Sequence, residues 1–138
     1  MLAVTVSLAT PEQEGLVCGL LSAYLAELDV QSTYPYLSFY WQEPERFPYV
    51  IAADDEIVGF ALVREVGTDP SFEMAEFYVM PGHRRVGIGR KAVWELFAIH
   101  RGSWQVNAMP SSAEAQAFWA SVLSANSCLR NSSAAYVA

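Results

Sequence analysis

The 138 residues predict one α+β domain, in which helices cover both faces of a mixed, mostly antiparallel sheet. The composition, with 53 % hydrophobic and 17 % charged residues, suits one packed core and argues against disorder. The segments follow one another as strand, helix, helical turns, three antiparallel strands, helix, strand and helix. No repeat or low-complexity linker divides residues 1–138, so we expect a single domain.

The chain opens with a predicted strand and helix. Residues 2–8 are apolar and β-branched, which favours a strand. Thr10, Pro11 and Gln13 form a helix start, with a capping hydroxyl, a proline at the first helical position and a glutamine at the third. The side chains that this helix is expected to bury are Leu16, Leu20, Leu21, Tyr24 and Leu25.

Aromatic residues and prolines dominate residues 31–48, which predict short helical turns within loops. A hairpin follows them. Residues 48–53 and 57–63 are two apolar runs, and an acidic turn at 54–56 joins them. We expect this turn to be solvated.

The next apolar run, residues 72–80, predicts a strand that ends at Pro81, and residues 84–89 then read Arg-Arg-Val-Gly-Ile-Gly. A helical pattern follows, with apolar spacing at Ile88, Ala92, Val93, Leu96 and Phe97. Glycines let backbone N–H groups approach a phosphate, and a helix start adds positive potential. Five of the eight basic residues cluster here: Arg84, Arg85, Arg90, Lys91 and Arg101. The pattern therefore predicts a phosphate-bearing cofactor.

Two other phosphate-binding motifs fit less well. The loop of nucleotide hydrolases needs Gly-x-x-x-x-Gly-Lys-Ser/Thr, which this region does not have. The Rossmann fingerprint needs a third glycine and an acidic residue about 20 positions later. Ala92 stands at the third position, and the strand predicted at 103–109 ends in Asn-Ala-Met. Both dinucleotide interpretations therefore rank below the following one.

Residues 72–97 resemble the GNAT superfamily of acyl-CoA-dependent N-acyltransferases, and within it a small bacterial branch. Arg84, Gly87 and Gly89 match the central motif of the superfamily, Gln/Arg-x-x-Gly-x-Gly/Ala. The strand before the motif ends in Val-Met-Pro at residues 79–81, as it does in the family.

The downstream segments agree with this resemblance. Residues 103–109 look like the next strand, and a helix is expected around 112–124. Asn107 and residues 115–119 are similar to the Asn…Ala-x-x-Phe/Leu-Tyr signature of the family. The resemblance covers roughly residues 1–125 and implies a GNAT-like sheet with helices on both faces.

Two positions and the C-terminal tail depart from the family pattern. Val86 stands where glycine is common, and Trp119 replaces the tyrosine that often protonates the leaving thiolate. The family usually adds two more strands, but only residues 126–138 follow the last helix, so the C-terminal strands look shortened. The best strand candidate there is 134–137.

The resemblance implies that acetyl-CoA binds along one strand and the glycine loop. Amides of residues 85–90 would hold the pyrophosphate, with the arginines as secondary donors. Backbone groups of the strand 72–80 and the Asn107 side chain would bind the pantetheine arm, and Trp119 would pack on the cofactor or the core. The predicted cofactor-binding residues are Tyr78, Val79, Arg84, Arg85, Val86, Gly87, Ile88, Gly89, Arg90, Asn107 and Trp119.

The candidate bases are Glu73 and Glu76, because an amine with a pKa near 10.4 needs a base or a water relay at neutral pH. Glu73 stands 11 residues before Arg84, where family members with a glutamate base carry it. Glu76 lies closer to the expected thioester, in an apolar stretch where burial would raise its pKa. Residues three apart on a regular strand face opposite sides, so both can serve only across a bulge. We favour Glu76 and keep Glu73 as the alternative.

Trp119 cannot act as an acid, so the proton for the thiolate must come from elsewhere. A water molecule or one of Tyr34, Tyr36 and Tyr40 could supply it. These tyrosines are equally consistent with loop packing or with the walls of an acceptor pocket.

The resemblance implies an N-acetyltransferase that moves an acetyl group from acetyl-CoA to a primary amine of an unidentified small molecule or peptide, by direct attack. The alternative is a catalytically degenerate acyl-CoA-binding module with a sensory or structural role, which Trp119 and the short tail favour. A homodimer is also expected, with residues 103–109 or 126–138 in its interface, because an incomplete sheet exposes a strand edge.

The rest of the sequence limits the partners. A net charge of −7 argues against nucleic acid or an anionic membrane surface. His83 and His100 do not form a metal-ligand cluster, and we expect no metal. Cys18 and Cys128 have no paired spacing, which predicts a reduced, cytoplasmic chain. We expect neither a membrane helix nor a signal peptide, because no apolar run is long enough and the N-terminus lacks a basic region.

Overall fold

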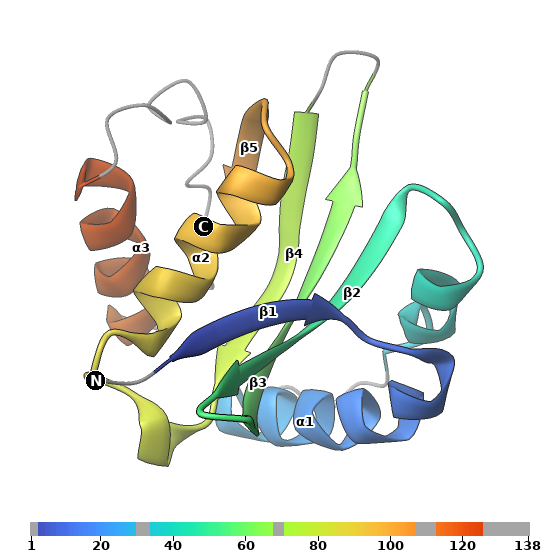
Figure 1. Cartoon of the computed structure of the whole chain (residues 1–138), viewed down its shortest axis with the longest axis horizontal. Coiled ribbons are helices and arrows are strands. Elements are labelled where there is room, and N and C mark those ends of the chain that lie inside the picture. The colour runs from blue at the N-terminus through green and yellow to red at the C-terminus, as the bar shows by residue number, and fades with distance from the viewer. Residues whose placement is uncertain (1–2, 30–33, 68–70, 107–112, 126–138) are drawn as a thin grey trace.

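A computed structural model describes residues 3–29, 34–67, 71–106 and 113–125. Its centre is one five-stranded sheet in the order β1-β2-β3-β4-β5 (Figure 1). The strands are β1 (Val4–Leu8), β2 (Arg46–Ala53), β3 (Glu56–Glu65), β4 (Ser71–Val79) and β5 (Ser103–Val106). Neighbours from β1 to β4 are antiparallel, and β5 joins β4 in parallel. The predicted mixed, mostly antiparallel sheet is confirmed.

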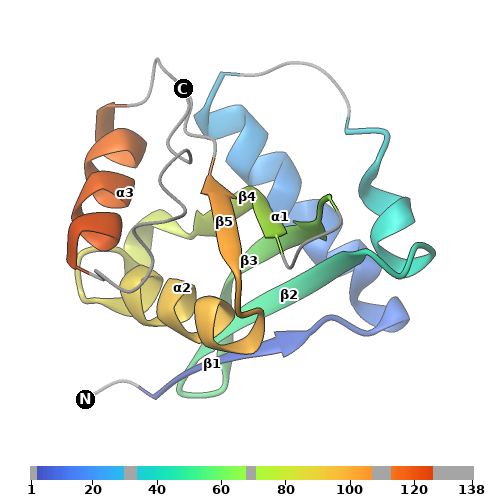
Figure 2. The same ribbon diagram turned by 90° about the horizontal axis from the view of Figure 1, so that it is seen from above.

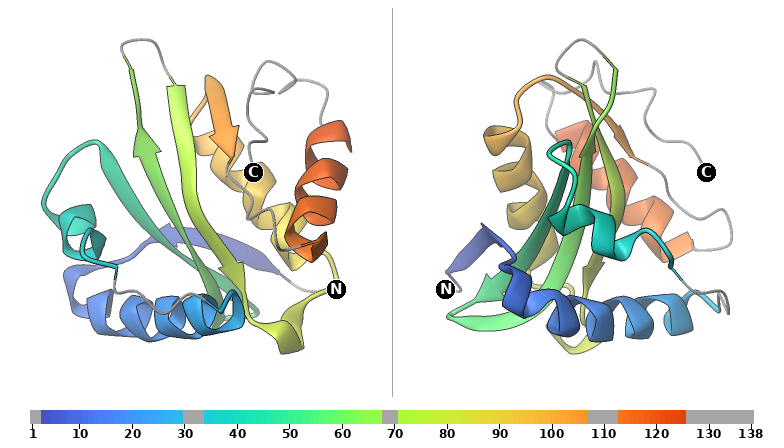
Figure 3. Two further views of the ribbon diagram at one scale, coloured as in Figure 1. Left: turned by 180° about the vertical axis from the view of Figure 1, so that it is seen from behind. Right: turned by 90° about the vertical axis from the view of Figure 1, so that its right-hand side faces the viewer.

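Helices cover both faces of this sheet (Figure 2). They are α1 (Glu14–Glu27), α2 (Ile88–Ile99) and α3 (Ala113–Ala125), with short 3-10 helices η1 (Pro11–Gln13), η2 (Leu37–Trp41) and η3 (Pro81–His83). On one face, α1 and η2 pack around Phe60, Leu62 and Tyr78. On the other face, α2 and α3 lie side by side (Figures 1 and 3) and share one apolar cluster with β4 and β5.

The start of the first helix follows the predicted pattern, but its buried face differs. Gln13 accepts a hydrogen bond from the Thr10 N–H at 2.9 Å. The residues that α1 buries fully are Val17 and Leu21, whereas the predicted core residue Leu16 is 43 % exposed. The helix is rotated about its axis relative to the expectation. Because α1 is apolar on several sides, its contact with Phe60 and Leu62 of the sheet determines that the side carrying Val17 is buried. Leu20, Tyr24 and Leu25 pack partly against that cluster.

Two other boundaries differ from the sequence-based expectation. Strand β2 begins at Arg46, within the region predicted as helical turns, because Arg46 pairs with Arg64 of β3. Strand β5 is described only to Val106. The remainder of the strand predicted at 103–109, and the expected edge strand at 134–137, lie outside the described residues.

A β-bulge in β4 decides which side chains face α1. Glu76 pairs with Leu62 and Met74 pairs with Val63, so Ala75 is one residue too many. Before the bulge, Met74 points into the α2 cluster; after it, Tyr78 points into the α1 cluster. Glu73 and Glu76 therefore share the α1 face, as only a bulge allows.

Gly59 of β3 lies directly beside the backbone of β4 at Tyr78 and Val79. A Cβ atom at this position would overlap the Tyr78 carbonyl oxygen. We expect Gly59→Ala to lower the free energy of unfolding by about 1–3 kcal/mol, the usual cost of overpacking, in urea denaturation.

Gly19→Ala is the matched control. Gly19 is exposed in α1, with nothing within 4 Å of an added Cβ, so the same change should stabilise the chain by about 1 kcal/mol. Equal stabilities of the two variants would contradict the close approach at Gly59.

Candidate functional site

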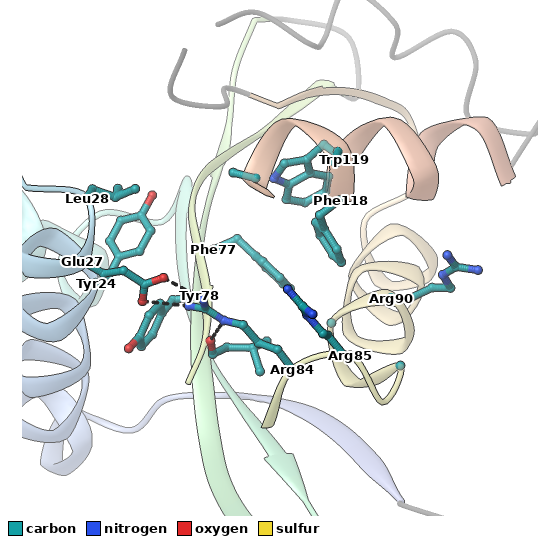
Figure 4. Close-up of a pocket in the computed structure, with 15 residues that line it drawn as sticks. Tyr24, Glu27, Leu28, Phe77, Tyr78, Arg84, Arg85, Arg90, Phe118 and Trp119 are labelled. Atoms are coloured by element: carbon teal, nitrogen blue, oxygen red, sulfur yellow. Dashed lines mark hydrogen bonds and ion pairs between the residues drawn. The ribbon is translucent and has the colours of Figure 1, made fainter. Parts of the chain in front are cut away.

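A cavity of about 620 Å³ opens between α1, the end of β4, the start of α2 and α3 (Figure 4). In Figure 4, Tyr24 and Glu27 come from α1 on one side, and Phe118 and Trp119 come from α3 on the other. Its described lining is Tyr24, Glu27, Leu28, Phe77, Tyr78, Val79, Arg84, Arg85, Gly87, Gly89, Arg90, Ala115, Ala117, Phe118 and Trp119.

Most of the predicted cofactor-binding residues line this cavity, but two of the described ones do not. Val86 is 59 % exposed and points outside the described lining, whereas Ile88 is 1 % exposed, so its side chain belongs to the core. Asn107 lies outside the described residues. The described pairing of β4 with β5 ends at Met74 and Val106, whereas β4 continues along the cavity to Val79.

The glycine loop forms the N-terminal end of α2. Gly87 is the N-cap residue with a left-handed φ of 90°, which turns the chain into the helix. The first N–H groups of a helix have no acceptor within it, so the first turn of α2 presents backbone donors beside the cavity. Gly89 has a packing role, since its missing Cβ would lie 3.1 Å from the Phe118 ring. This end of the cavity is suited to an anion.

Arg84 holds the glycine loop to α1. Its Nε donates to the Val79 carbonyl at 2.7 Å, and its two terminal nitrogens donate to the Glu27 carboxylate at 2.6 and 2.9 Å. The guanidinium group also lies 5.6 Å from the centre of the Tyr78 ring. This geometry gives the Arg84 side chain a positioning role, and we call the Arg84–Glu27 pair the clasp.

The other two loop arginines differ from Arg84 and from each other. Arg85 has a positive φ of 68°, and its side chain extends toward Phe77 within the cavity (Figure 4). Arg90 instead points away from the cavity in this view and donates to the Ser121 hydroxyl at 2.8 Å, which ties α2 to α3. Arg85 is therefore the arginine best placed to meet a phosphate.

The two glutamates differ in their surroundings. Glu73 forms an ion pair with Arg64 at 3.5 Å. Burial raises the pKa of Glu76 above its ordinary value, and the negative charge of Glu73 adds to this, whereas hydrogen bonding by the Tyr24 and Tyr34 hydroxyls opposes it. A half-buried carboxylate with a raised pKa is suited to general-base work near neutral pH.

The sequence reasoning did not identify Tyr24 as a site residue. It was assigned to the core face of the first helix, and its ring does pack edge-on against Phe60 and Tyr78, at 5.8 and 5.6 Å between ring centres. Its hydroxyl group interacts with Glu76, and it lines the cavity. A polar-tipped aromatic residue near the end of an otherwise apolar helix face was the available signal.

The tyrosines considered as acids lie in other settings. Tyr34 interacts with Glu76, and burial raises its pKa most. Tyr36 is 54 % exposed. The Tyr40 hydroxyl is buried, and its surroundings include the Tyr34 hydroxyl and the Arg46 guanidinium group. None of the three belongs to the described lining of the cavity.

Trp119 packs as a wall between the cavity and the core. It is 5 % exposed, its ring centre lies 5.4 Å from that of Phe77, and Phe118 stacks on Phe77 from the same helix. An indole ring in this position supplies shape and apolar contact to a bound group, and no proton.

The described residues hold neither a metal cluster nor a membrane span. No group of three or more histidine, cysteine, aspartate or glutamate side chains among them could bind a metal ion. In the same part of the chain, no helix is long and apolar enough to cross a membrane.

Comparison with known proteins assigns the family. Residues 17–123 match the model of the acetyltransferase (GNAT) family, so the chain belongs to it. No curated protein matches the chain in sequence.

Several solved structures share the fold. An acetyltransferase of the GNAT family from Staphylococcus aureus Mu50 superposes with a TM-score of 0.74 at 14 % identity, over 86 % of this chain and 82 % of the other. A ribosomal-protein-alanine N-acetyltransferase from Brucella melitensis biovar Abortus superposes with a TM-score of 0.69 at 19 % identity, over 86 % of this chain and 89 % of the other. A predicted acetyltransferase with acetyl-CoA from Clostridium acetobutylicum superposes with a TM-score of 0.67 at 10 % identity, over 85 % of this chain and 88 % of the other.

The clasp should contribute measurably to stability. Arg84→Gln and Glu27→Gln should each lower the melting temperature, and the double variant should lose little more than Arg84→Gln alone, because both changes remove the Arg84–Glu27 pair and only Arg84→Gln also removes the bond to the Val79 carbonyl. The coupling energy should be near the upper end of the roughly 0.2–1 kcal/mol found for partly exposed pairs, and should fall at high salt.

Glu56→Gln is the control for this cycle. The Glu56 carboxylate is exposed and lies 3.9 Å from His83, so its removal should leave the melting temperature unchanged. Fully additive losses from Arg84→Gln and Glu27→Gln would contradict the clasp.

Proposed function

We propose that this GNAT protein transfers an acetyl group from acetyl-CoA to a primary amine of a small molecule or peptide, by direct attack of the amine on the thioester. The observation that carries the proposal is the bulged strand β4. This strand carries Glu76, whose pKa is raised, and it ends near Gly87, where the start of α2 is suited to an anion.

Acetyl-CoA would bind with its phosphates at the start of α2 and its pantetheine arm along β4. The backbone N–H groups of the first turn of α2 and the Arg85 side chain would hold the phosphates. Backbone groups of Tyr78 and Val79 would hydrogen-bond the arm, much as an added strand would, and one amide would polarise the thioester carbonyl. The thioester would then lie toward Glu76.

Glu76 would remove the proton that the amine must lose, directly or through water. Its carboxylate form is the active one, so the rate should rise with pH through the pKa of Glu76, which burial places above the ordinary value. Glu73 remains the alternative base, and its carboxylate lies 3.5 Å from the Arg64 guanidinium group.

The alternative is an acyl-CoA-binding module without turnover. The observation that favours it is the buried Trp119 ring, which stands where the family often has an acidic tyrosine. Such a module would bind acetyl-CoA equally well, and only acetyl transfer separates the two proposals.

We also propose that the protein is cytoplasmic and that it forms a homodimer. Among the described residues β5 pairs only with β4, and an edge strand of this kind can pair with a second chain. This supports an interface that includes residues 103–109 or 126–138.

Acetyl-CoA should raise the melting temperature, by about 2.7 kcal/mol of added stability at a ligand concentration 100 times Kd. Gly87→Asp should abolish the shift. A Cβ at Gly87 meets nothing within 4 Å and aspartate tolerates the left-handed backbone, so the variant should fold while its charge repels the phosphates. Gly82→Asp adds the same charge outside the cavity and should keep the shift. If a folded wild type shows no shift, the chain does not bind acetyl-CoA.

Glu76→Gln should lower kcat by about 10²–10⁴-fold, the usual effect of losing a general base, with the acetyl-CoA affinity nearly unchanged. An amine acceptor is first found by screening for release of the CoA thiol. The acidic limb of the pH–rate profile should disappear in this variant. Glu73→Gln is the matched control: a loss there, with Glu76→Gln unaffected, would move the base to Glu73.

A further inference from the structure

The departing thiolate needs a proton, and Trp119 cannot provide it. We propose that the Tyr24 hydroxyl protonates the thiolate, and that Glu76 passes the proton taken from the amine back to Tyr24. This inference rests on the proposed acetyl transfer. It assigns the acid to α1, because α3 carries a tryptophan at the expected position.

Tyr24 connects the two parts of the site. It lines the cavity between α1 and α3, and its hydroxyl group interacts with Glu76 on the neighbouring face of β4. Edge-on contacts with Phe60 and Tyr78 hold its ring. One turn further along α1, Glu27 is fastened to Arg84. The packing therefore leaves the ring of Tyr24 little freedom.

The other tyrosines near the site are less suitable donors. Tyr34 interacts with Glu76 but does not belong to the described lining of the cavity, and Tyr36 is exposed. Tyr78 does line the cavity, but its ring lies beneath Arg84, at the phosphate end. Tyr24 is thus the tyrosine that reaches both Glu76 and the cavity.

The proton transfers balance. As the neutral amine attacks, the C–N bond forms, the C–S bond breaks, and one proton of the nitrogen moves to the Glu76 carboxylate. Tyr24 gives its hydroxyl proton to the sulfur, and protonated Glu76 returns a proton to the Tyr24 oxygen. The net change is one proton moved from nitrogen to sulfur, with both side chains restored.

The electrostatics favour this order of events. Burial and the nearby Glu76 charge raise the pKa of Tyr24, so its hydroxyl group is protonated at neutral pH and can donate. A phenol with a raised pKa would not by itself release a proton to a thiolate with a pKa near 8.5. The adjacent protonated carboxyl makes the transfer favourable, because the overall donor is then Glu76.

The test is Tyr24→Phe, measured with an amine that the wild type acetylates. Phenylalanine keeps the ring contacts, so the melting temperature and the acetyl-CoA affinity should hold. The value of kcat should fall about 10²-fold or more, in the range for loss of an acid–base group. Tyr36→Phe removes an exposed hydroxyl outside the site and should match the wild type.

Two readouts separate a proton relay from a structural role. Hydrogen bonding by Tyr24 lowers the pKa of Glu76, so the acidic limb of the pH–rate profile should move to higher pH in Tyr24→Phe. The double variant Tyr24→Phe/Glu76→Gln should be little slower than the slower single variant, because both residues act on one proton path.

The outcomes are distinct. If the wild type binds acetyl-CoA but acetylates no amine, the proposed function fails, and the relay fails with it. If the wild type is active and Tyr24→Phe keeps its kcat, the relay alone is overturned. A lower kcat with an unmoved acidic limb and fully additive losses would likewise overturn it, in favour of a packing role.

Discussion

The bulge at Ala75 is the constraint on which the candidate site depends. A regular β4 would alternate its side chains without interruption, and Glu76 would then face α2 and α3, on the side opposite Glu73. The extra residue turns Glu76 and Tyr78 toward α1 and turns Phe77 toward Phe118. One inserted position thereby separates the apolar wall of the cavity at Phe77 from the face that carries Glu73 and Glu76.

The second constraint joins the layers around the cavity. The start of α2 can serve as an anion site only if it is held at the end of β4, and Arg84 holds it there through the Val79 carbonyl. The same side chain fastens the end of α1 through Glu27. A residue that the motif marks for the cofactor therefore positions the helix that carries Tyr24. On the far side, Gly89 lets Phe118 pack against the first turn of α2.

The order of the elements along the chain, the helix start at Thr10 and the glycine loop could be predicted because each depends on residues close in sequence. The left-handed turn at Gly87 is one case, since glycine there adopts φ > 0 readily. The buried face of α1 could not be predicted in the same way. That helix is apolar on several sides, so its own pattern does not choose between Leu16 and Val17, and the sheet that it contacts makes the choice.

The sequence by itself determined the α+β class and the order of the elements, and it predicted an anion site at the start of the second long helix. These follow from hydrophobic periodicity and backbone preferences, which act over a few neighbouring residues. Only the tertiary structure decided that Glu73 and Glu76 share a face, that Arg84 pairs with Glu27, and that Tyr24 stands between Glu76 and the cavity. The physical reason is strand register: a bulge is set by pairing between β3 and β4, and it moves every later side chain to the opposite face.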